Sequence, residues 1–531
     1  MNVQTASVLE ITDLTVARAG AALPELDRFS LTLNAGETVI VLGETGCGKE
    51  ALLRAVSGTS RPDERVSGLI RFGNLQASPA PGRHGSGIRV AFLPCMDQAV
   101  LSPAADALSQ LVRILARKLG LPRASAREEL RLTLARMEGA VPIAALRGRP
   151  STLDPGALAY GFLAVALAQS PDLVVADHAL SLLSPLQARN IANALLVAQK
   201  QLGFALLYAA RGTLATTWLG GRILVMRAGK IVEEGPLERL ISPHAHTYTQ
   251  TLYKSEMAGI PAQKPTGRGE PILQVRGLRL AARNNAGGAG EAITFDLRRG
   301  AALAIVGEPG SGRRELMRAI LGLEKPAAGR TIFDSVDIGI LSRSMVSRLR
   351  RRVAFITGDD DVLDPRMTVR DTVEEPLRAH LNLSRDHVAG YREAALKRVG
   401  LSAMPREKTV AALSSFDRRR LQIARAIVAV PRLAVIEEPQ RGLGPLEQSV
   451  MIDLLKEFHA QEGPAFLILT ANFGLARALA GDALVLKDRQ IVARGNLADL
   501  FRAPQDAYTK SLIEAVTPKP QEGLSQAVPQ G

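Results

Sequence analysis

Cysteine, aromatic residues and long apolar runs are all scarce in this chain of 531 residues. The two cysteines, Cys47 and Cys95, lie far apart and have no disulfide or metal-ligand spacing, which excludes a disulfide-stapled fold and a cysteine-based zinc site. The longest nearly unbroken apolar run, 156–168, has 13 residues and is too short to span a bilayer. The N-terminus lacks the basic-then-apolar pattern of a secretory signal. We therefore expect a reduced, cytosolic protein with no membrane span of its own.

The composition is that of a globular protein, with 46% apolar and 22% charged residues, and the length predicts two to four domains. A net charge of +14 raises nucleic acid or an anionic membrane surface as a partner. Arginines cluster at 348–352 and 418–420, but no aromatic residues alternate with them as a stacking surface for bases would require. We expect solvated helix faces or a docking surface at these clusters, and no nucleic acid partner.

The two halves of the chain repeat each other. The segment VLGETGCGKE at 41–50 recurs as IVGEPGSGRR at 305–314, and the segments that end at Gly235 and contain Tyr248 recur 260 residues later, at Gly495 and Tyr508. Such self-similarity predicts a tandem duplication. The predicted parts are a first domain at 8–254, a Pro- and Gly-containing linker at 255–271, a second domain at 272–516 and a disordered tail at 517–531.

Each half alternates short aliphatic runs with helical stretches. The runs ETVIVLG, DLVVAD, FALLYA and RLAVIEE predict strands of a mainly parallel sheet with crossover helices, so each half is expected to be α/β. A helix-rich, strand-poor insert is expected near 102–149 in the first half and 365–410 in the second.

A glycine-rich loop follows the first predicted strand of this kind in each half and precedes a helix. In the order strand, Gly-x-x-Gly-x-Gly-Lys, helix, the backbone N–H groups wrap phosphates and the helix N-terminus adds positive potential. The candidate nucleotide-binding residues of the first loop are Gly43, Glu44, Thr45, Gly46, Cys47, Gly48, Lys49 and Glu50. Those of the second loop are Gly307, Glu308, Pro309, Gly310, Ser311, Gly312, Arg313 and Arg314.

With these motifs in place, the chain resembles, over nearly its whole length, a fused pair of ATP-binding-cassette (ABC) ATPases of the dipeptide, oligopeptide and nickel importer type. The segment DPRMTVRDTVEEPL at 364–377 and the endings around Tyr248 and Tyr508 resemble that branch. The resemblance implies two P-loop NTPase domains, each with a helical subdomain, that use ATP and Mg²⁺. It also implies two transmembrane permease subunits and a solute-binding protein as partners, and a peripheral location on the cytoplasmic face of the inner membrane. In such importers each ATP is held between the phosphate loop of one copy and the signature helix of the other.

The family's other motifs fall on unusual residues. The resemblance places the signature at Asp154, Pro155 and Gly156 in the first copy, and at Ser414, Ser415 and Phe416 in the second. It places the metal-binding carboxylate at Asp177 and Glu437, and the catalytic carboxylate at His178 and Glu438. The switch histidine falls on Ala210 and Ala471, the glutamine-loop residue on Cys95 and Thr357, and the adenine-stacking aromatic near Arg18 and Ala282.

The signature substitutions predict ordinary helix starts. The carboxylate of Asp154 can bond the free N–H groups of its helix, and proline suits the first helical position at Pro155. Ser414 and Asp417 have the spacing of a capping box, and Phe416 places a large side chain where bare backbone would meet phosphate.

The substitutions at the phosphate loops weaken the expected chemistry. Arg313 can still pair with phosphate, whereas Arg314 cannot ligate Mg²⁺, so it either occupies the place of the metal or lines an empty pocket. Glu50 can ligate Mg²⁺ but adds negative charge beside the phosphates.

The two catalytic positions leave alternatives open. His178 is a candidate base that lacks the negative charge of a carboxylate. Glu438 is either a working catalytic carboxylate or a relic held by hydrogen bonds. Fast hydrolysis is therefore not expected.

Three interpretations of function follow. The first is the ATP-binding subunit of an ABC importer for peptides or related solutes, coupling nucleotide state to its permease. The second is a catalytically impaired pseudo-ATPase that serves as a scaffold or regulator of the same permease. The third is a tandem cassette that acts on ribosomes or nucleic acid, which the short connection between the copies disfavours. The sequence does not name the transported solute.

Overall fold

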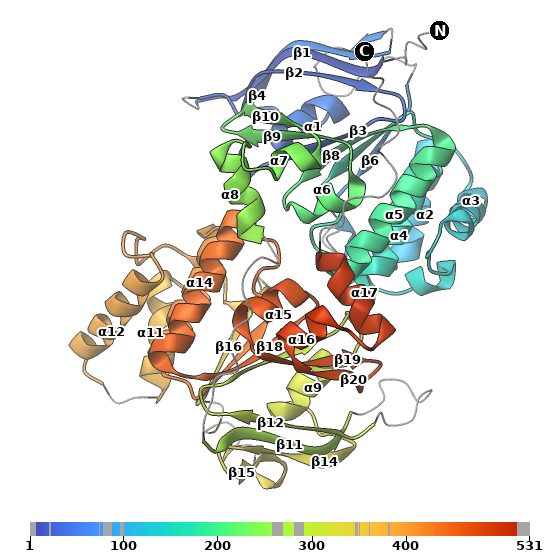
Figure 1. Ribbon diagram of the computed structural model, residues 1–531. Helices are drawn as coiled ribbons and strands as arrows, with labels where there is room; N and C mark the ends of the chain where they lie inside the picture. Colours follow the sequence, from blue (N-terminus) through green and yellow to red (C-terminus); the bar gives the residue numbers. More distant parts are fainter. Residues whose placement is uncertain are drawn as a thin grey trace. The chain divides into compact units, whose positions relative to one another are not determined.

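The computed structural model divides into two compact units, made mainly of residues 1–256 and 257–517 (Figure 1). It describes residues 7–20, 23–73, 75–77, 88–95, 100–256, 269–280, 291–342, 344–345, 349, 351–359, 362–380 and 383–517. Most of the predicted linker 255–271 and of the tail after 517 lies outside the described residues, as do Arg348, Arg350 and Ala282.

The larger sheet has the same topology in both units. In spatial order the strands of the first are β10 (Lys230–Gly235), β9 (Arg222–Arg227), β3 (Thr38–Leu42), β8 (Ala205–Ala210), β7 (Leu173–Asp177) and β6 (Val90–Leu93). Those of the second are β20 (Gln490–Asn496), β19 (Asp482–Lys487), β13 (Ala302–Val306), β18 (Ala465–Thr470), β17 (Leu433–Glu437) and β16 (Val353–Thr357). All neighbours pair in parallel except β9 with β10 and β19 with β20. The predicted duplication and the α/β class with mainly parallel sheets are therefore confirmed.

A second, four-stranded antiparallel sheet accompanies each larger sheet and was not predicted from the sequence. The strands are, in spatial order, β2 (Leu26–Asn34), β1 (Ser7–Arg18), β4 (Glu64–Phe72) and β5 (Leu75–Ala77). The second unit repeats the order with β12 (Ile293–Arg298), β11 (Pro271–Arg279), β14 (Ala328–Phe333) and β15 (Val336–Asp337). The alternation of buried Leu9 and Ile11 with polar neighbours in β1 is the signal that predicts such a half-buried strand.

Helices connect and cover the sheets (Figure 1). The first unit has α1 (Lys49–Ser57), α2 (Ala107–Leu119), α3 (Arg123–Arg136), α4 (Pro155–Leu167), α5 (Pro185–Leu202), α6 (Leu214–Leu219), α7 (Leu237–Leu240) and α8 (Thr247–Glu256). The second has α9 (Arg313–Ile320), α11 (Val369–His380), α12 (Arg385–Arg398), α13 (Ser415–Val428), α14 (Pro445–Glu462), α15 (Phe473–Leu479), α16 (Leu497–Arg502) and α17 (Ala507–Val516). The predicted helix-rich inserts correspond to α2 and α3, and to α11 and α12.

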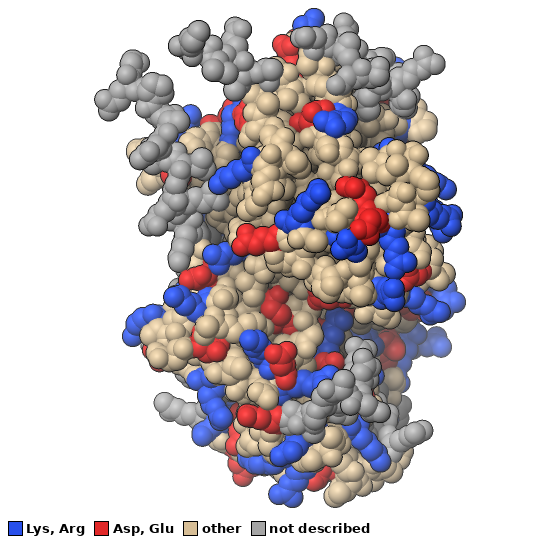
Figure 2. Space-filling view, turned by 90° about the vertical axis from the view of Figure 1, so that its right-hand side faces the viewer, with Lys and Arg blue, Asp and Glu red and all other residues tan. Residues whose placement is uncertain are grey.

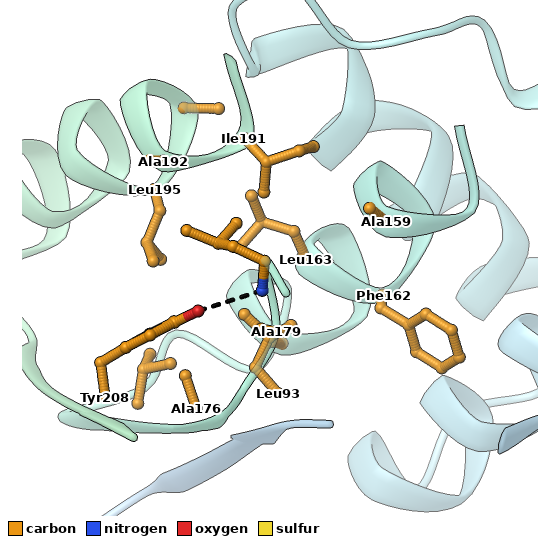
Figure 3. Close-up of a cluster of buried hydrophobic side chains, with 14 of the residues drawn as sticks. Leu93, Ala159, Phe162, Leu163, Ala176, Ala179, Ile191, Ala192, Leu195 and Tyr208 are labelled. Carbon is orange, nitrogen blue, oxygen red and sulfur yellow. Dashed lines mark hydrogen bonds between the residues drawn. The ribbon is translucent and has the colours of Figure 1, made fainter. Parts of the chain in front are cut away.

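The central strands are buried on both faces because successive side chains of a strand point in opposite directions. In β3, Ile40 and Leu42 join one core cluster, and Val39 and Val41 join another on the opposite face. Figure 3 shows part of the first cluster, where side chains of α4 and α5 pack over β7 and β8. There the hydroxyl of Tyr208 accepts a hydrogen bond from the backbone N–H of Leu180 at 3.0 Å, which anchors the segment that follows β7.

Charges of both signs are mixed on the face of the molecule that Figure 2 displays. Figure 2 shows Lys and Arg interspersed with Asp and Glu over the face it displays, rather than one continuous basic patch. In the part of the chain that the structure describes, no helix is both long and apolar enough to cross a membrane.

Candidate nucleotide sites

Each glycine-rich loop runs from the end of a central strand to the start of a helix, as its motif predicts. The first connects β3 to α1, and the second connects β13 to α9. Gly48 has a φ of 108°, and a Cβ there would lie 2.4 Å from the carbonyl oxygen of Glu25, so a glycine is required. Gly312 takes the same left-handed conformation, with a φ of 100°. The two loops therefore share one backbone path despite their different side chains.

Lys49 folds back onto its own loop. Its ammonium donates hydrogen bonds to the carbonyl oxygens of Gly43 at 2.7 Å and Glu44 at 2.8 Å, and the side chain is fully buried. The thiol of Cys47 lies 3.5 Å from the same ammonium, and burial raises the pKa of that thiol. The loop carbonyls thus stabilise the charge that a phosphate would otherwise neutralise.

The first copy brings Glu50, Asp177 and His178 together. Nε2 of His178 lies 3.2 Å from Oε1 of Glu50 and 3.6 Å from Oδ1 of Asp177. Burial raises the pKa of Glu50, but the hydrogen bond from His178 and the charge of Lys49 outweigh it and lower this pKa to about 2. The imidazole therefore meets two carboxylates at the place where the family motif has a hydroxyl, one carboxylate and a metal.

These residues still offer oxygen ligands to Mg²⁺. Oδ1 of Asp177 is buried and has no hydrogen-bond partner among the described residues, and Glu50 directly follows Lys49 in the chain. Mg²⁺ prefers carboxylate oxygens, so Asp177 and Glu50 are the residues of the first copy that would offer ligands to such an ion.

The second copy replaces this arrangement with paired arginines and carboxylates. Nε of Arg314 donates to Oε1 of Glu437 at 2.5 Å, and its Nη2 lies 3.3 Å from Oδ2 of Asp359. Nη1 of Arg441 lies 3.3 Å from the other oxygen of Asp359. Burial opposes the charged form of Arg314, yet the carboxylates of Glu437 and Asp359 hold its pKa above the ordinary value. Asp359 and Arg441 were not foreseen, because only the pairing of β16 with β17 brings them to this edge of the sheet.

Glu438 accepts hydrogen bonds on both oxygens. Oε1 accepts from Nη1 of Arg313 at 3.1 Å and from the backbone N–H of Ala471 at 2.5 Å. Oε2 accepts from Nε2 of Gln440 at 2.8 Å and from the hydroxyl of Thr470 at 2.8 Å. Burial raises the pKa of this carboxyl, but Arg313 and the other donors outweigh it and lower the pKa overall. A carboxylate has about four lone-pair sites, so these donors saturate Glu438.

Both catalytic positions have a left-handed backbone. The φ angle is 48° at His178 and 42° at Glu438, and each residue donates its backbone N–H to the neighbouring strand, to Ala209 or to Leu469, at 3.1 Å. The segment after β7 and the segment after β17 therefore leave the sheet in the same way.

The first signature position forms a capped helix start, as the sequence predicts. The carboxylate of Asp154 accepts a hydrogen bond from the backbone N–H of Ala157 at 2.9 Å, and Pro155 is the first residue of α4. Nε2 of Gln187 adds a further donor to Asp154 at 3.0 Å. The anion-binding end of α4 is thus occupied by a carboxylate from its own chain.

The second signature position is capped by a hydroxyl. Oγ of Ser414 accepts from the backbone N–H of Asp417 at 3.1 Å, which is one half of the expected capping box. The carboxylate of Asp417 pairs with Arg420 instead of completing the box, because the guanidinium offers a stronger, charged partner. The same Arg420 lies 4.7 Å from the ring centroid of Phe416.

The positions of the switch histidine, the glutamine-loop residue and the adenine-stacking aromatic hold other residue types. Ala210 ends β8 and Ala471 follows β18, and both are buried. Sγ of Cys95 lies 3.9 Å from Oγ of Ser181. Arg18, near the expected adenine position, pairs with Glu25 and Asp63.

Comparison with known proteins agrees with the duplicated architecture. A family model described as ABC transporter matches residues 26–181 and again 291–441. The ABC transporter ATP-binding protein YejF of Escherichia coli (strain K12) is 31% identical over 509 residues, which cover 91% of this chain and 94% of that protein.

Two further relatives match over similar lengths. The peptidoglycan transport ATP-binding protein YejF of Agrobacterium fabrum is 30% identical and the match covers 96% of each chain. The glutathione import ATP-binding protein GsiA of Salmonella paratyphi A is 29% identical, over 96% of this chain and 89% of that protein. Two glycine-rich loops on two sheets of one topology, each matched by the same family model, show that this chain belongs to the ABC transporter family.

Proposed function

We propose that the chain is the ATP-binding subunit of an importer for peptides or related solutes. The observation that carries this proposal is the match over nearly the whole length, through both cassettes, to proteins named for peptidoglycan transport and glutathione import. The retained order of strand, glycine loop and helix in each unit supports it independently, because this backbone binds phosphates through its N–H groups.

Two transmembrane permease subunits and a solute-binding protein complete the proposed importer. The chain would then act at the cytoplasmic face of the membrane, as a peripheral subunit that couples its nucleotide state to the permease. Membership of the ABC transporter family supports these partners.

In this proposal the two glycine-rich loops, 43–50 and 307–314, hold the phosphates of ATP. Lys49 would exchange the carbonyls of Gly43 and Glu44 for phosphate oxygens, and Asp177 with Glu50 would hold Mg²⁺ in the first copy. The metal would supply charge neutralisation at the β- and γ-phosphates.

The saturation of Glu438 favours a second candidate function, a catalytically impaired regulator of the same permease. A general base needs a free lone pair to accept a proton from water, and the four donors around Glu438 occupy all of them. In the first copy His178 stands at this position and contacts Glu50. Nucleotide binding with slow turnover is compatible with both candidates, but only the importer subunit requires the binding.

Transport measured in cells tests the proposal. The coding sequence is deleted, and uptake of radiolabelled short peptides and glutathione is measured with and without a plasmid copy. We expect uptake to fall on deletion and to return with the unmodified chain, but not with a Lys49→Ala, Arg313→Ala double variant. Unchanged uptake of every peptide class after deletion would contradict the importer proposal. Uptake restored by the double variant would favour the scaffold over the nucleotide-coupled subunit.

A further inference from the structure

The second nucleotide site does not fit Mg²⁺. The ion needs oxygen ligands in near-octahedral geometry, usually from a loop hydroxyl and a carboxylate. Here the hydroxyl position is Arg314, which has no lone pair, and its Nε donates to Glu437 at 2.5 Å. The carboxylate that would face the metal therefore faces a guanidinium of the same charge sign as the metal.

The charges of this site balance without a divalent ion. Arg313 pairs with Glu438, and Arg314 with Glu437 and Asp359. Arg441 contributes a further positive charge at Asp359. A cation added to this cluster would have to displace a guanidinium from a carboxylate, whereas a phosphate can accept hydrogen bonds from guanidinium N–H groups that the carboxylates leave unused.

Unused donors are present in the second loop. The side chain of Arg313 is 10% exposed, and its buried Nε has no hydrogen-bond partner among the described residues. The buried Oγ of Ser311, two residues earlier, is also without a partner there. Donors at these positions of a glycine-rich loop suit phosphate oxygens, which accept hydrogen bonds.

The two loops differ in how their basic residue is satisfied. In the first copy the ammonium of Lys49 donates to the carbonyl oxygens of Gly43 and Glu44. In the second copy Nη1 of Arg313 donates to Glu438, and Nε of Arg313 has no hydrogen-bond partner among the described residues. The second loop therefore keeps a donor from which a phosphate oxygen can accept a hydrogen bond.

We propose that the second phosphate loop binds the phosphates of a nucleotide without a divalent metal, with Arg314 in the place that Mg²⁺ takes in ordinary ABC sites. The inference rests on the proposed function, since it assumes that the ligand is a nucleotide. Arg314 suits this role because its side chain is 59% exposed while the carboxylate behind it, Glu437, is 9% exposed. The planar guanidinium can thus keep its bond to Glu437 and present its remaining N–H groups to a phosphate.

Equilibrium titration with ATP, in Mg²⁺ and in EDTA, tests this inference on the purified full chain. The Lys49→Ala variant isolates the second loop, and Arg313→Ala isolates the first. We expect Lys49→Ala to bind ATP with an affinity that changes less than threefold between Mg²⁺ and EDTA. We expect Arg313→Ala to bind ATP at least tenfold more weakly in EDTA than in Mg²⁺. Arg313→Lys serves as the matched control and should keep EDTA-resistant binding.

A variant that restores the family's residue types provides a second test. The double change Arg314→Thr and Glu437→Asp, made in the Lys49→Ala background, recreates a hydroxyl and a shorter carboxylate. Its ATP affinity should become at least tenfold weaker in EDTA than in Mg²⁺. Circular dichroism and thermal unfolding check that each variant folds.

The outcomes separate the two proposals. If Lys49→Ala binds ATP only in Mg²⁺, the metal-free site is overturned and the importer subunit survives. If the chain binds no ATP in either condition, both the inference and the nucleotide-coupled function are overturned.

Photolabelling of the unmodified chain with 8-azido-ATP in EDTA, followed by mass spectrometry, gives an independent assignment. Labelled peptides from residues 257–517 support the inference, and labels confined to residues 1–256 overturn it.

Discussion

The hydroxyl of Tyr508 accepts a hydrogen bond from the backbone N–H of Glu308 at 2.8 Å, across 200 residues of sequence. The first copy repeats this contact, where the N–H of Glu44 donates to the hydroxyl of Tyr248 at 3.3 Å. Burial raises the pKa of Tyr508 to about 12, so its hydroxyl stays neutral at every ordinary pH. In each unit the last helix therefore holds the start of the glycine-rich loop.

Removing this hydroxyl should loosen the second loop. Tyr508→Phe leaves the N–H of Glu308 without its partner, and we expect a loss of about 1 kcal/mol in the free energy of unfolding. Hydrogen exchange should accelerate in peptides that contain 307–312 more than elsewhere. Tyr391→Phe, at a tyrosine that is 53% exposed, is the control and should change neither quantity. Equal acceleration throughout the unit would show that the bond has no local role.

The cap of α4 supplies a second prediction. Asp154→Ala removes the acceptor for Ala157 and should lower the free energy of unfolding by about 1 kcal/mol in urea titrations. Asp154→Asn retains an acceptor oxygen and should cost only a few tenths of a kcal/mol. A large loss in both variants would indicate that the charge, rather than the cap, stabilises this helix.

Hydrolysis should be insensitive to Glu438. Because four donors saturate its carboxylate, Glu438→Gln is expected to change the ATP turnover of the purified chain by less than about threefold, against the 10²–10⁴-fold loss typical of a working general base. Phosphate release measured over hours is the readout. Turnover that falls a hundredfold in Glu438→Gln would identify this carboxylate as the base and reject the scaffold interpretation.

Restoring the ordinary residues of the first copy should raise turnover. Glu50→Thr with His178→Glu removes the imidazole–carboxylate contact and supplies a hydroxyl and a carboxylate at the family's positions. We expect phosphate release at least tenfold faster than in the unmodified chain. The single variants Glu50→Thr and His178→Glu are the controls. Each restores only one of the two family residues, so neither should speed phosphate release comparably.

The contact between Glu50 and His178 also predicts a pH dependence of stability. The folded state lowers the pKa of Glu50 from 4.5 to about 2, so it favours the ionised carboxylate. The resulting stabilisation is complete above pH 4.5 and disappears as the pH falls toward 2. Glu50→Gln should abolish this part of the pH dependence, worth about 1–2 kcal/mol after screening by solvent. Glu238→Gln, on an exposed turn of α7, should leave the curve unchanged.

Much of the fold could be predicted because the informative signals are local. The glycine loops, the strands that precede them and the Asp154–Pro155 helix start each lie within a few consecutive residues, where spacing and capping rules apply. The four-stranded sheets were not predicted although β1 carries an alternating pattern, because the sheet forms only when β1 pairs with β2 and with the distant β4.

The contacts that decide the chemistry of the site could not be predicted, since each joins distant segments. Arg314 meets Glu437 and Asp359 only when β13, β17 and β16 lie in one sheet, and Ala471 reaches Glu438 from the end of the adjacent strand. The sequence shows which residue types replace the motif. It does not show that the replacements pair with one another, because pairing depends on side-chain geometry at the sheet edge.

The left-handed turns at His178 and Glu438 have a consequence for protein engineering. A non-glycine residue at positive φ costs about 1–2 kcal/mol. Both units nevertheless retain this conformation, although the residue carries an imidazole in one unit and a carboxylate in the other. In each case the backbone N–H reaches the carbonyl of the next strand, so the geometry is imposed by the sheet. The backbone at position 178 therefore keeps its left-handed conformation whichever side chain it carries. A designer can place a new functional side chain there without rebuilding the surrounding backbone.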